Sequence, residues 1–118
     1  VNMYINSKDR SGVLRKIKIS IGDFLGEEKD SEYIEMREPD IGEVMELNSD
    51  YNDDSQAWLI KNMPNLITRH TLHETETDLM TNEAVAGLIK ERVDIFIYVA
   101  MEYTNFFGAL SRKIKKEI

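Results

Sequence analysis

The stretch that decides the fold covers residues 81–118 and reads TNEAVAGLIKERVDIFIYVAMEYTNFFGALSRKIKKEI. Two amphipathic helical patterns follow one another in it. The first opens at the capping residue Thr81, and the second opens at Asp94 and runs to about Leu110 or beyond. Apolar residues recur at steps of three and four, which places them on one stripe of each helix: Val85, Leu88, Ile89, then Phe96, Val99, Ala100, Tyr103, Phe107 and Leu110. We expect a break at residues 91–94, with a single unbroken helix over residues 84–116 as the alternative.

Upstream of these helices, the sequence predicts a lead and a pair of strands. Residues 1–12 have no sustained periodicity and predict a flexible lead. Residues 16–21 alternate between polar residues and isoleucine, and residues 33–37 alternate again. A period of two indicates a half-buried strand. Residues 13–38 therefore predict an antiparallel β-hairpin with a long loop.

Two further helices are predicted between the hairpin and the C-terminal pair. Pro39 suits the first turn of a helix, whose buried stripe would hold Ile41, Val44, Met45 and Leu47. One of residues 53–55 would cap the next helix, which Pro64 would end. Residues 68–80 are polar and predict an extended connection. The fold class is mainly α (α+β), in one domain of 118 residues. The N-terminal hairpin precedes about four helices in residues 39–112, the C-terminal two are central, and residues 113–118 form a frayed basic tail.

Composition and charge exclude several classes of function. There is no cysteine, so disulfides and thiolate chemistry are absent. The net charge is −7, and residues 21–56 hold 13 Asp and Glu against Lys29 and Arg37. Phosphate backbones repel such a surface, so we expect no nucleic-acid partner. Neither a secretory signal nor a spanning apolar segment is visible, and we expect a cytoplasmic chain with no membrane contact.

The candidate metal-binding residues match known sites poorly. His70 and His73 lie near three carboxylates, but no helical pattern aims the two imidazoles at one ion. Residues 50–54 begin like a calcium loop, but Ser55 and Lys61 occupy its sixth and twelfth positions. Helix capping explains that segment better. No nucleophile signature is present, and we expect no catalytic residue, cofactor or metal.

The last helix carries more aromatic and Met residues than one buried stripe needs. Either this helix is buried on several sides, or it packs one face in the core and offers another to a partner. A groove between it and the helix containing Trp58 would be the binding site. The candidate partner-binding residues are Trp58, Met63, Phe96, Tyr98, Met101, Tyr103, Phe106 and Phe107.

Four segments carry a resemblance to a known family: DFLGEE at residues 23–28, EMREPDIGEVMEL at 35–47, MPNLITRH at 63–70 and MTNEAVAGLI at 80–89. Together they resemble the small tail assembly chaperones of long-tailed, siphovirus-type bacteriophages, especially those of Gram-positive hosts, over roughly residues 17–110. The resemblance implies a non-enzymatic, self-associating, mainly helical protein of the host cytoplasm that is absent from the mature virion. It would bind the tape-measure protein and keep it soluble while tail-tube subunits assemble, with the tail-tube protein as a second partner.

Two alternatives remain open at this stage. One is a structural phage connector or tail-associated protein, which purified virions would retain. The other is a small metal-binding regulator that uses His70 and His73.

Overall fold

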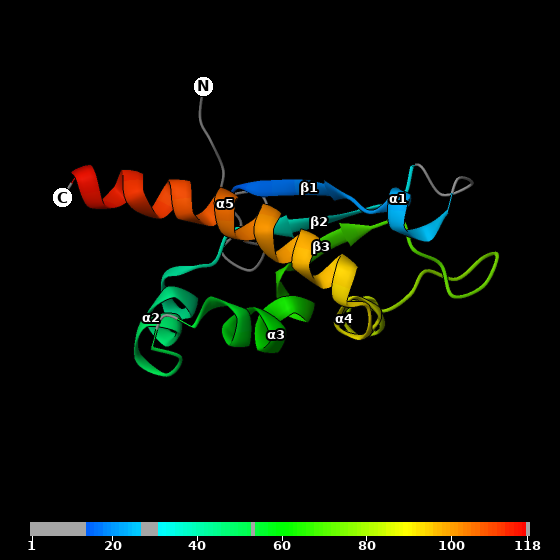
Figure 1. Ribbon diagram of the computed structural model, residues 1–118, viewed down its shortest axis with the longest axis horizontal. Helices are drawn as coiled ribbons and strands as arrows, with labels where there is room; N and C mark the ends of the chain where they lie inside the picture. The colour runs from blue at the N-terminus through cyan, green and yellow to red at the C-terminus, as the bar shows by residue number, and fades with distance from the viewer. Residues whose placement is uncertain (1–13, 27–30, 53, 118) are drawn as a thin grey trace, which may run out of the picture.

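The computed structural model describes residues 14–26, 31–52 and 54–117, with side chains as far as residue 108. In chain order the elements are β1 (Lys16–Ser20), α1 (Gly22–Leu25), β2 (Tyr33–Arg37), α2 (Ile41–Ser49), α3 (Ser55–Leu66), β3 (Ile67–His70), α4 (Asn82–Glu91) and α5 (Val93–Glu117) (Figure 1). The α+β class with a predominance of helix is confirmed. The predicted flexible lead, residues 1–12, lies outside the described residues.

The strands form one antiparallel sheet in the order β1-β2-β3. The predicted pairing of β1 with β2 is confirmed, with Ile19 opposite Ile34. Two details of the hairpin differ from expectation. The connection holds the short helix α1, and β3 adds a third strand beside β2, with Ile34 opposite His70. Residues 68–80 are predicted to be an extended connection, and residues 68–70 are extended, but their pairing with β2 is not predicted. A four-residue strand is too short to show alternation, and its partner lies more than thirty residues away.

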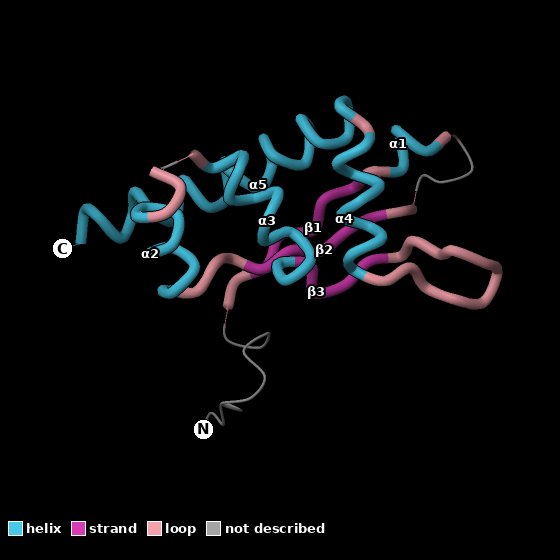
Figure 2. Tube along the Cα trace, turned by 90° about the horizontal axis from the view of Figure 1, so that it is seen from below, coloured by secondary structure: helices cyan, strands magenta, loops and turns pink. Residues whose placement is uncertain are grey.

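The alternating pattern divides the sheet into two faces. Ile17, Ile19, Ile34 and Met36 point towards the helices, where all but the half-buried Ile17 are buried. The polar residues between them form the opposite, outer face. Figure 2 shows α5 crossing one side of the sheet, with α3 and α4 beside it. The two edge strands carry Lys16, Lys18 and Arg69, and charged side chains protect an edge from pairing with another strand.

Capping residues set where the helices begin. Thr81 accepts a hydrogen bond from the Ala84 N–H at the start of α4, as predicted, and Asp54 does the same for α3. The expected break between α4 and α5 is confirmed, because Arg92 has extended backbone angles. The helix α5 starts at Val93 and continues to Glu117, so the predicted frayed tail is helical through residue 117.

Both prolines occupy positions other than those predicted. Pro39 lies outside α2, whose N-cap is Asp40, so it does not sit in the first turn. Pro64 lies inside α3, which continues to Leu66 instead of ending before the proline. Burial of Leu66 in the core offsets the one backbone hydrogen bond that Pro64 removes.

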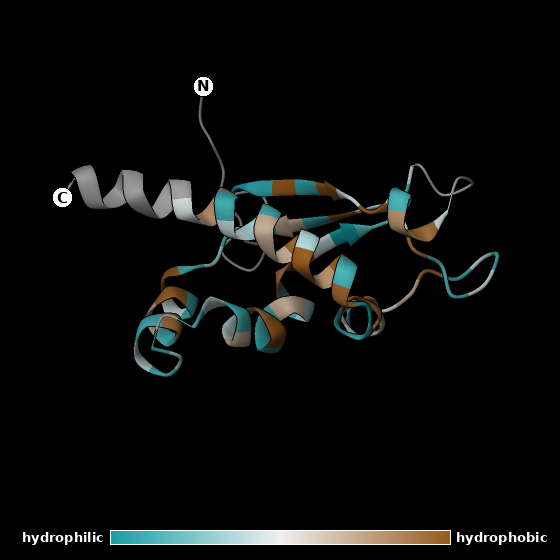
Figure 3. Cartoon of the chain, viewed as in Figure 1, coloured by the Kyte–Doolittle hydropathy of each residue, from teal (hydrophilic) through white to brown (hydrophobic). Residues whose placement is uncertain are grey.

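The core lies between the inner sheet face and helices α3, α4 and α5. Its largest fully buried side chains include Trp58 and Tyr103, whose rings stack with centroids 6.5 Å apart. Figure 3 shows polar and apolar residues alternating along β1, as expected for a strand with one buried face. The helix α2 differs, since Leu47 is its one buried residue. The predicted buried stripe is thus right at Leu47 and wrong at Ile41 and Met45, which are 79% and 64% exposed.

Candidate functional site

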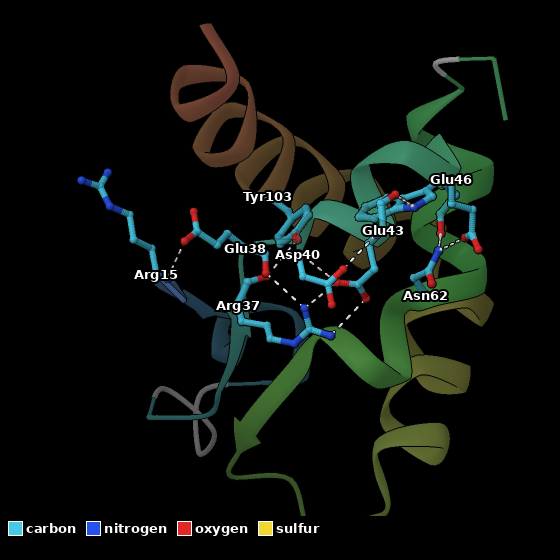
Figure 4. A network of polar contacts seen from close by, with 9 residues as sticks. Arg15, Arg37, Glu38, Asp40, Glu43, Glu46, Asn62 and Tyr103 are labelled. Carbon is cyan, nitrogen blue, oxygen red and sulfur yellow. Dashed lines mark hydrogen bonds and ion pairs between the residues drawn. The ribbon is translucent and has the colours of Figure 1, made fainter. Parts of the chain in front are cut away.

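A polar cluster, together with the buried side chain of Leu47, attaches α2 to the rest of the molecule (Figure 4). The Arg37 guanidinium donates two hydrogen bonds to the Glu43 carboxylate, at 2.7 and 3.0 Å. Glu43 also accepts from the Asp40 N–H, which completes a capping box at the start of α2. The Trp58 indole donates to the Glu43 carbonyl, and the Tyr103 hydroxyl donates to the Arg37 carbonyl. Four elements, β2, α2, α3 and α5, therefore meet at one set of hydrogen bonds.

Neighbouring groups and burial shift the pKa values of several side chains in and near this cluster. Hydrogen bonding to Glu43 raises the pKa of Arg37 above its ordinary value. Burial raises the pKa of Tyr103 well above the usual range for a phenol. The hydrogen bond from Asn62, together with that from Lys61, lowers the pKa of the Glu46 carboxyl. These arrangements hold the fold together, because the charged groups of this cluster are bonded to one another within the chain. Among the described residues, the buried Glu38 Oε2 atom has no hydrogen-bond partner.

Three of the predicted partner-binding residues belong to the core. Trp58, Met63 and Tyr103 are at most 2% exposed, so their side chains cannot contact a partner while the chain is folded. Sequence periodicity could not show whether these three residues lie in the core or on a binding surface, because a core stripe and a binding stripe have the same spacing. The prediction that these three form a binding surface is corrected accordingly.

The remaining predicted residues are distributed around α5. Tyr98 packs against Phe24, with ring centroids 5.3 Å apart. Phe106 lies 6.4 Å from the Tyr103 ring, and Phe107 lies 6.4 Å from the Trp58 ring. These half-buried aromatic rings pack mainly on their own chain. Phe96 and Met101 differ from them, because both line an open groove.

This groove, which we call the α3–α5 groove, runs between the first turn of α3 and the middle of α5. Its volume is about 460 Å³. It is lined by Ser55 and Gln56 from α3 and by Phe96, Ile97, Ala100, Met101, Thr104 and Asn105 from α5. It lies between the same two helices as the groove expected from the sequence, but neither Trp58 nor Met63 lines it. The apolar half of its lining comes entirely from α5.

An exposed apolar stripe runs along α5 and into this groove. Val93, Ile97 and Met101 are 70%, 52% and 60% exposed and follow one another at four-residue steps. Steps of four place them on one face. The candidate partner-binding residues predicted from the sequence omit Val93 and Ile97, because they were chosen for aromatic and Met content, although Ile97 belongs to the surplus apolar surface of this helix. The spacing of Val93, Ile97 and Met101 is the signal that would have revealed them.

Both histidines are engaged with the backbone. The His70 Nδ1 atom accepts from the Leu72 N–H at 3.1 Å, so its other ring nitrogen carries the proton that is donated to the Met80 carbonyl at 2.8 Å. The His73 ring lies 2.8 Å from the Thr71 carbonyl. Among the described residues, no group of three or more His, Asp or Glu side chains is arranged to hold a metal ion. His70 thus fastens the end of β3 to Met80, just before α4, whereas the His73 ring contacts the backbone of its own segment.

Comparison of the chain with protein-family models, curated protein sequences and solved structures gives no match. Over the described residues, no helix is both long enough and apolar enough to cross a membrane.

Proposed function

We propose that this protein is a non-enzymatic chaperone for phage tail assembly, which binds the tape-measure protein in the α3–α5 groove and keeps it soluble. The observation that carries the proposal is the exposed stripe of Val93, Ile97 and Met101, which leads into a groove with an apolar floor. The resemblance of four sequence segments to tail assembly chaperones supplies the identity of the partner. On this proposal the protein acts in the host cytoplasm and is absent from the mature virion.

The geometry suits an amphipathic helix as the bound segment. Such a helix presents anchors at positions i, i+3, i+4 and i+7, and a groove between two helices can receive them. Burying one exposed Ile or Met side chain contributes about 1.5–3 kcal/mol. Ile97 and Met101 are 52% and 60% exposed, so their burial together contributes about 2–3 kcal/mol. The bound helix must gain the rest from further contacts along the groove, because association itself costs about 4–15 kcal/mol. A tape-measure protein is a long helical chain whose apolar stripe would otherwise promote aggregation, so covering that stripe maintains solubility.

The test is co-expression with a fragment of the tape-measure protein that this proposal names as the partner. The expected result is that the fragment becomes soluble and co-purifies with the chain. Met101→Lys should abolish both effects, because it places a charge on the apolar lining of the groove. Leu79→Lys is the matched control, since Leu79 is 55% exposed against 60% for Met101 but lies outside the groove. No co-purification with the unmodified chain, or equal loss in both variants, would contradict the proposal.

A structural connector or tail-associated protein would also bind other phage proteins, and mass spectrometry of purified particles distinguishes the two roles. A chaperone should be missing from the particle, whereas a connector should be present in stoichiometric amounts.

A further inference from the structure

A second pocket lies where α1, α4 and a projecting arm meet. The arm covers residues 72–80, and Figure 2 shows it as the loop that extends beyond β3 and α4. At its base the Met80 N–H donates to the Leu72 carbonyl, and further out the Glu74 N–H donates to the Asp78 carbonyl. The pocket, which we call the arm pocket, has a volume of about 260 Å³ and is lined by Leu25, Glu32, Leu72, His73, Met80 and Leu88. It shares no lining residue with the α3–α5 groove.

The arm pocket has the size and the lining of a site for one apolar side chain. Four of its six lining residues are Leu or Met. Leu72 is buried, whereas Leu25, Met80 and Leu88 are half-buried and keep part of their apolar surface open. Sites for drug-sized ligands usually measure about 300–1,000 Å³, so the smaller arm pocket suits a single large side chain better. A side chain of that kind is supplied by a protein segment.

The two polar residues of the lining both offer hydrogen-bond acceptors. The Glu32 carboxylate accepts from the neutral Thr71 hydroxyl at 2.6 Å, and it has no counter-ion among the described residues. The Thr71 carbonyl can only accept, so the His73 Nδ1 atom carries the proton that is donated to it at 2.8 Å. In the neutral ring, Nε2 then keeps its lone pair. A group that is positively charged and donates hydrogen bonds fits both residues.

Negative charge also surrounds the arm pocket. Residues 70–89 contain four Asp and Glu residues and neither Lys nor Arg. Three exposed carboxylates of the arm form no ion pair with any described residue: Glu74, Glu76 and Asp78. Arg92, which contacts the backbone of α1, is already paired with Asp94 at 2.8 Å. The carboxylates beside the pocket are therefore available to a cation from outside the chain.

We propose that the arm pocket binds a basic segment of another protein. The segment inserts one large apolar side chain among Leu72, Met80 and Leu88, and its Lys or Arg side chains lie beside Glu32 and the arm. Charge complementarity selects this occupant, because the lining accepts hydrogen bonds and the arm carries negative charge. Such a contact is small, and salt should weaken it because exposed charges are screened. The proposal does not rest on the proposed function, since the α3–α5 groove takes no part in the contact.

The test is an NMR titration of the isotope-labelled full chain with a short synthetic peptide, blocked at both ends, that has one leucine between two pairs of lysines. The amide signals of Leu72, His73, Met80 and Leu88 should shift on addition of the peptide. A peptide with serine in place of the leucine should bind at least about tenfold more weakly, because it buries no apolar side chain. A peptide with glutamates in place of the lysines should not bind.

Variants of the chain test the charge and the apolar lining separately. Glu32→Gln keeps the shape of the side chain and should weaken binding of the lysine peptide by about two- to fivefold, the effect of one exposed ion pair. Glu74→Gln combined with Asp78→Asn should have a similar or larger effect. Leu88→Lys should abolish binding, because it places a cation in the pocket. Its matched control is Ile97→Lys, which changes the α3–α5 groove and should leave binding of the peptide unchanged.

Four results would overturn the proposal: no shifted signals at millimolar peptide, shifts confined to another surface, equal binding of the serine or glutamate peptide, or unchanged affinity in both carboxylate variants. Isoamylamine, which joins the leucine side chain to an ammonium group, tests the other occupant. If this amine binds as tightly as the peptide, the pocket is a site for small amines and the proposal is wrong. Circular dichroism checks that each variant keeps its helix content. Unchanged co-purification of the tape-measure fragment with Leu88→Lys would separate this pocket from the proposed function.

Discussion

Replacing Glu43 by Gln tests whether the polar cluster holds α2 in place. The substitution keeps the size of the side chain but removes its charge, and one of the two hydrogen bonds from Arg37 is lost because an amide offers one acceptor oxygen. Both side chains are only 16% exposed, so water compensates little for the loss. Hydrogen bonds to charged groups contribute about 1.5–3 kcal/mol. The capping box adds little to the loss, because the amide oxygen can still accept from the Asp40 N–H. We expect the free energy of unfolding to fall by about 2–3 kcal/mol.

Trp58 makes this loss measurable. It is the one tryptophan of the chain, it is buried, and its indole donates to the Glu43 carbonyl at 3.1 Å. Its fluorescence should therefore report both on displacement of α2 and on global unfolding in urea. Glu91→Gln is the matched control, since Glu91 is exposed at the end of α4. We expect the control to change the free energy of unfolding by less than about 0.5 kcal/mol.

A double-mutant cycle with Arg37→Met isolates the pair. We expect a coupling free energy of at least about 1 kcal/mol between residues 37 and 43, because each charge depends on the other at this degree of burial. If Glu43→Gln unfolds at the same urea concentration as the unmodified chain, or if the two substitutions are additive, the ion pair does not hold α2 and the reasoning is wrong.

Three further predictions follow from single contacts. Gly26→Ala should destabilise the chain by about 1–3 kcal/mol, because its backbone angles φ 106° and ψ 165° are nearly exclusive to glycine. Gly87→Ala inside α4 should instead stabilise the chain by about 0.5–1 kcal/mol, because a Cβ at this position meets no other atom. Thermal unfolding of the two variants tests both predictions. The pKa of Glu46 is lowered mainly by the hydrogen bond from Asn62 and then by that from Lys61. These bonds stabilise the fold when the pH is above the ordinary carboxyl pKa, and their contribution is lost as the pH falls through the lowered pKa. In urea titrations, Glu46→Gln should therefore be less stable than the unmodified chain at neutral pH, and the difference should shrink as the pH falls below the ordinary carboxyl pKa. Tyr103→Phe should cost about 0.5–1.5 kcal/mol by equilibrium unfolding, the usual contribution of one hydrogen bond, and equal stability would show that its bond at 2.8 Å is dispensable.

Local signals predicted those parts of the fold that local chemistry determines. Thr81 and Asp54 cap helices because their side chains reach a backbone N–H three residues ahead. The isoleucines of residues 17–21 alternate because one sheet face is buried. Such interactions span a few residues, so their pattern is visible in the sequence alone.

Features set by distant contacts were not predictable in the same way. The strand β3 exists because β2 offers a partner some thirty residues earlier in the chain. Pro64 is accepted inside α3 because the helix end packs in the core at Leu66. Ile41 and Met45 have the spacing of a buried stripe, yet the polar cluster holds α2 so that they face outwards. In each case a tertiary contact outweighs a local preference.

The candidate site shows most clearly what the sequence does not reveal, because the buried and the exposed faces of α5 carry the same types of residue. Tyr103 and Met101 stand two residues apart and both carry large apolar side chains, but the first is 2% exposed and the second 60%. Two residues correspond to about 200° of helical rotation, so they must point in nearly opposite directions. Residue type alone therefore cannot separate core from partner surface on this helix. The rotational position of each residue relative to the sheet does separate them. It selects Val93, Ile97 and Met101 as the residues whose replacement should affect binding more than stability.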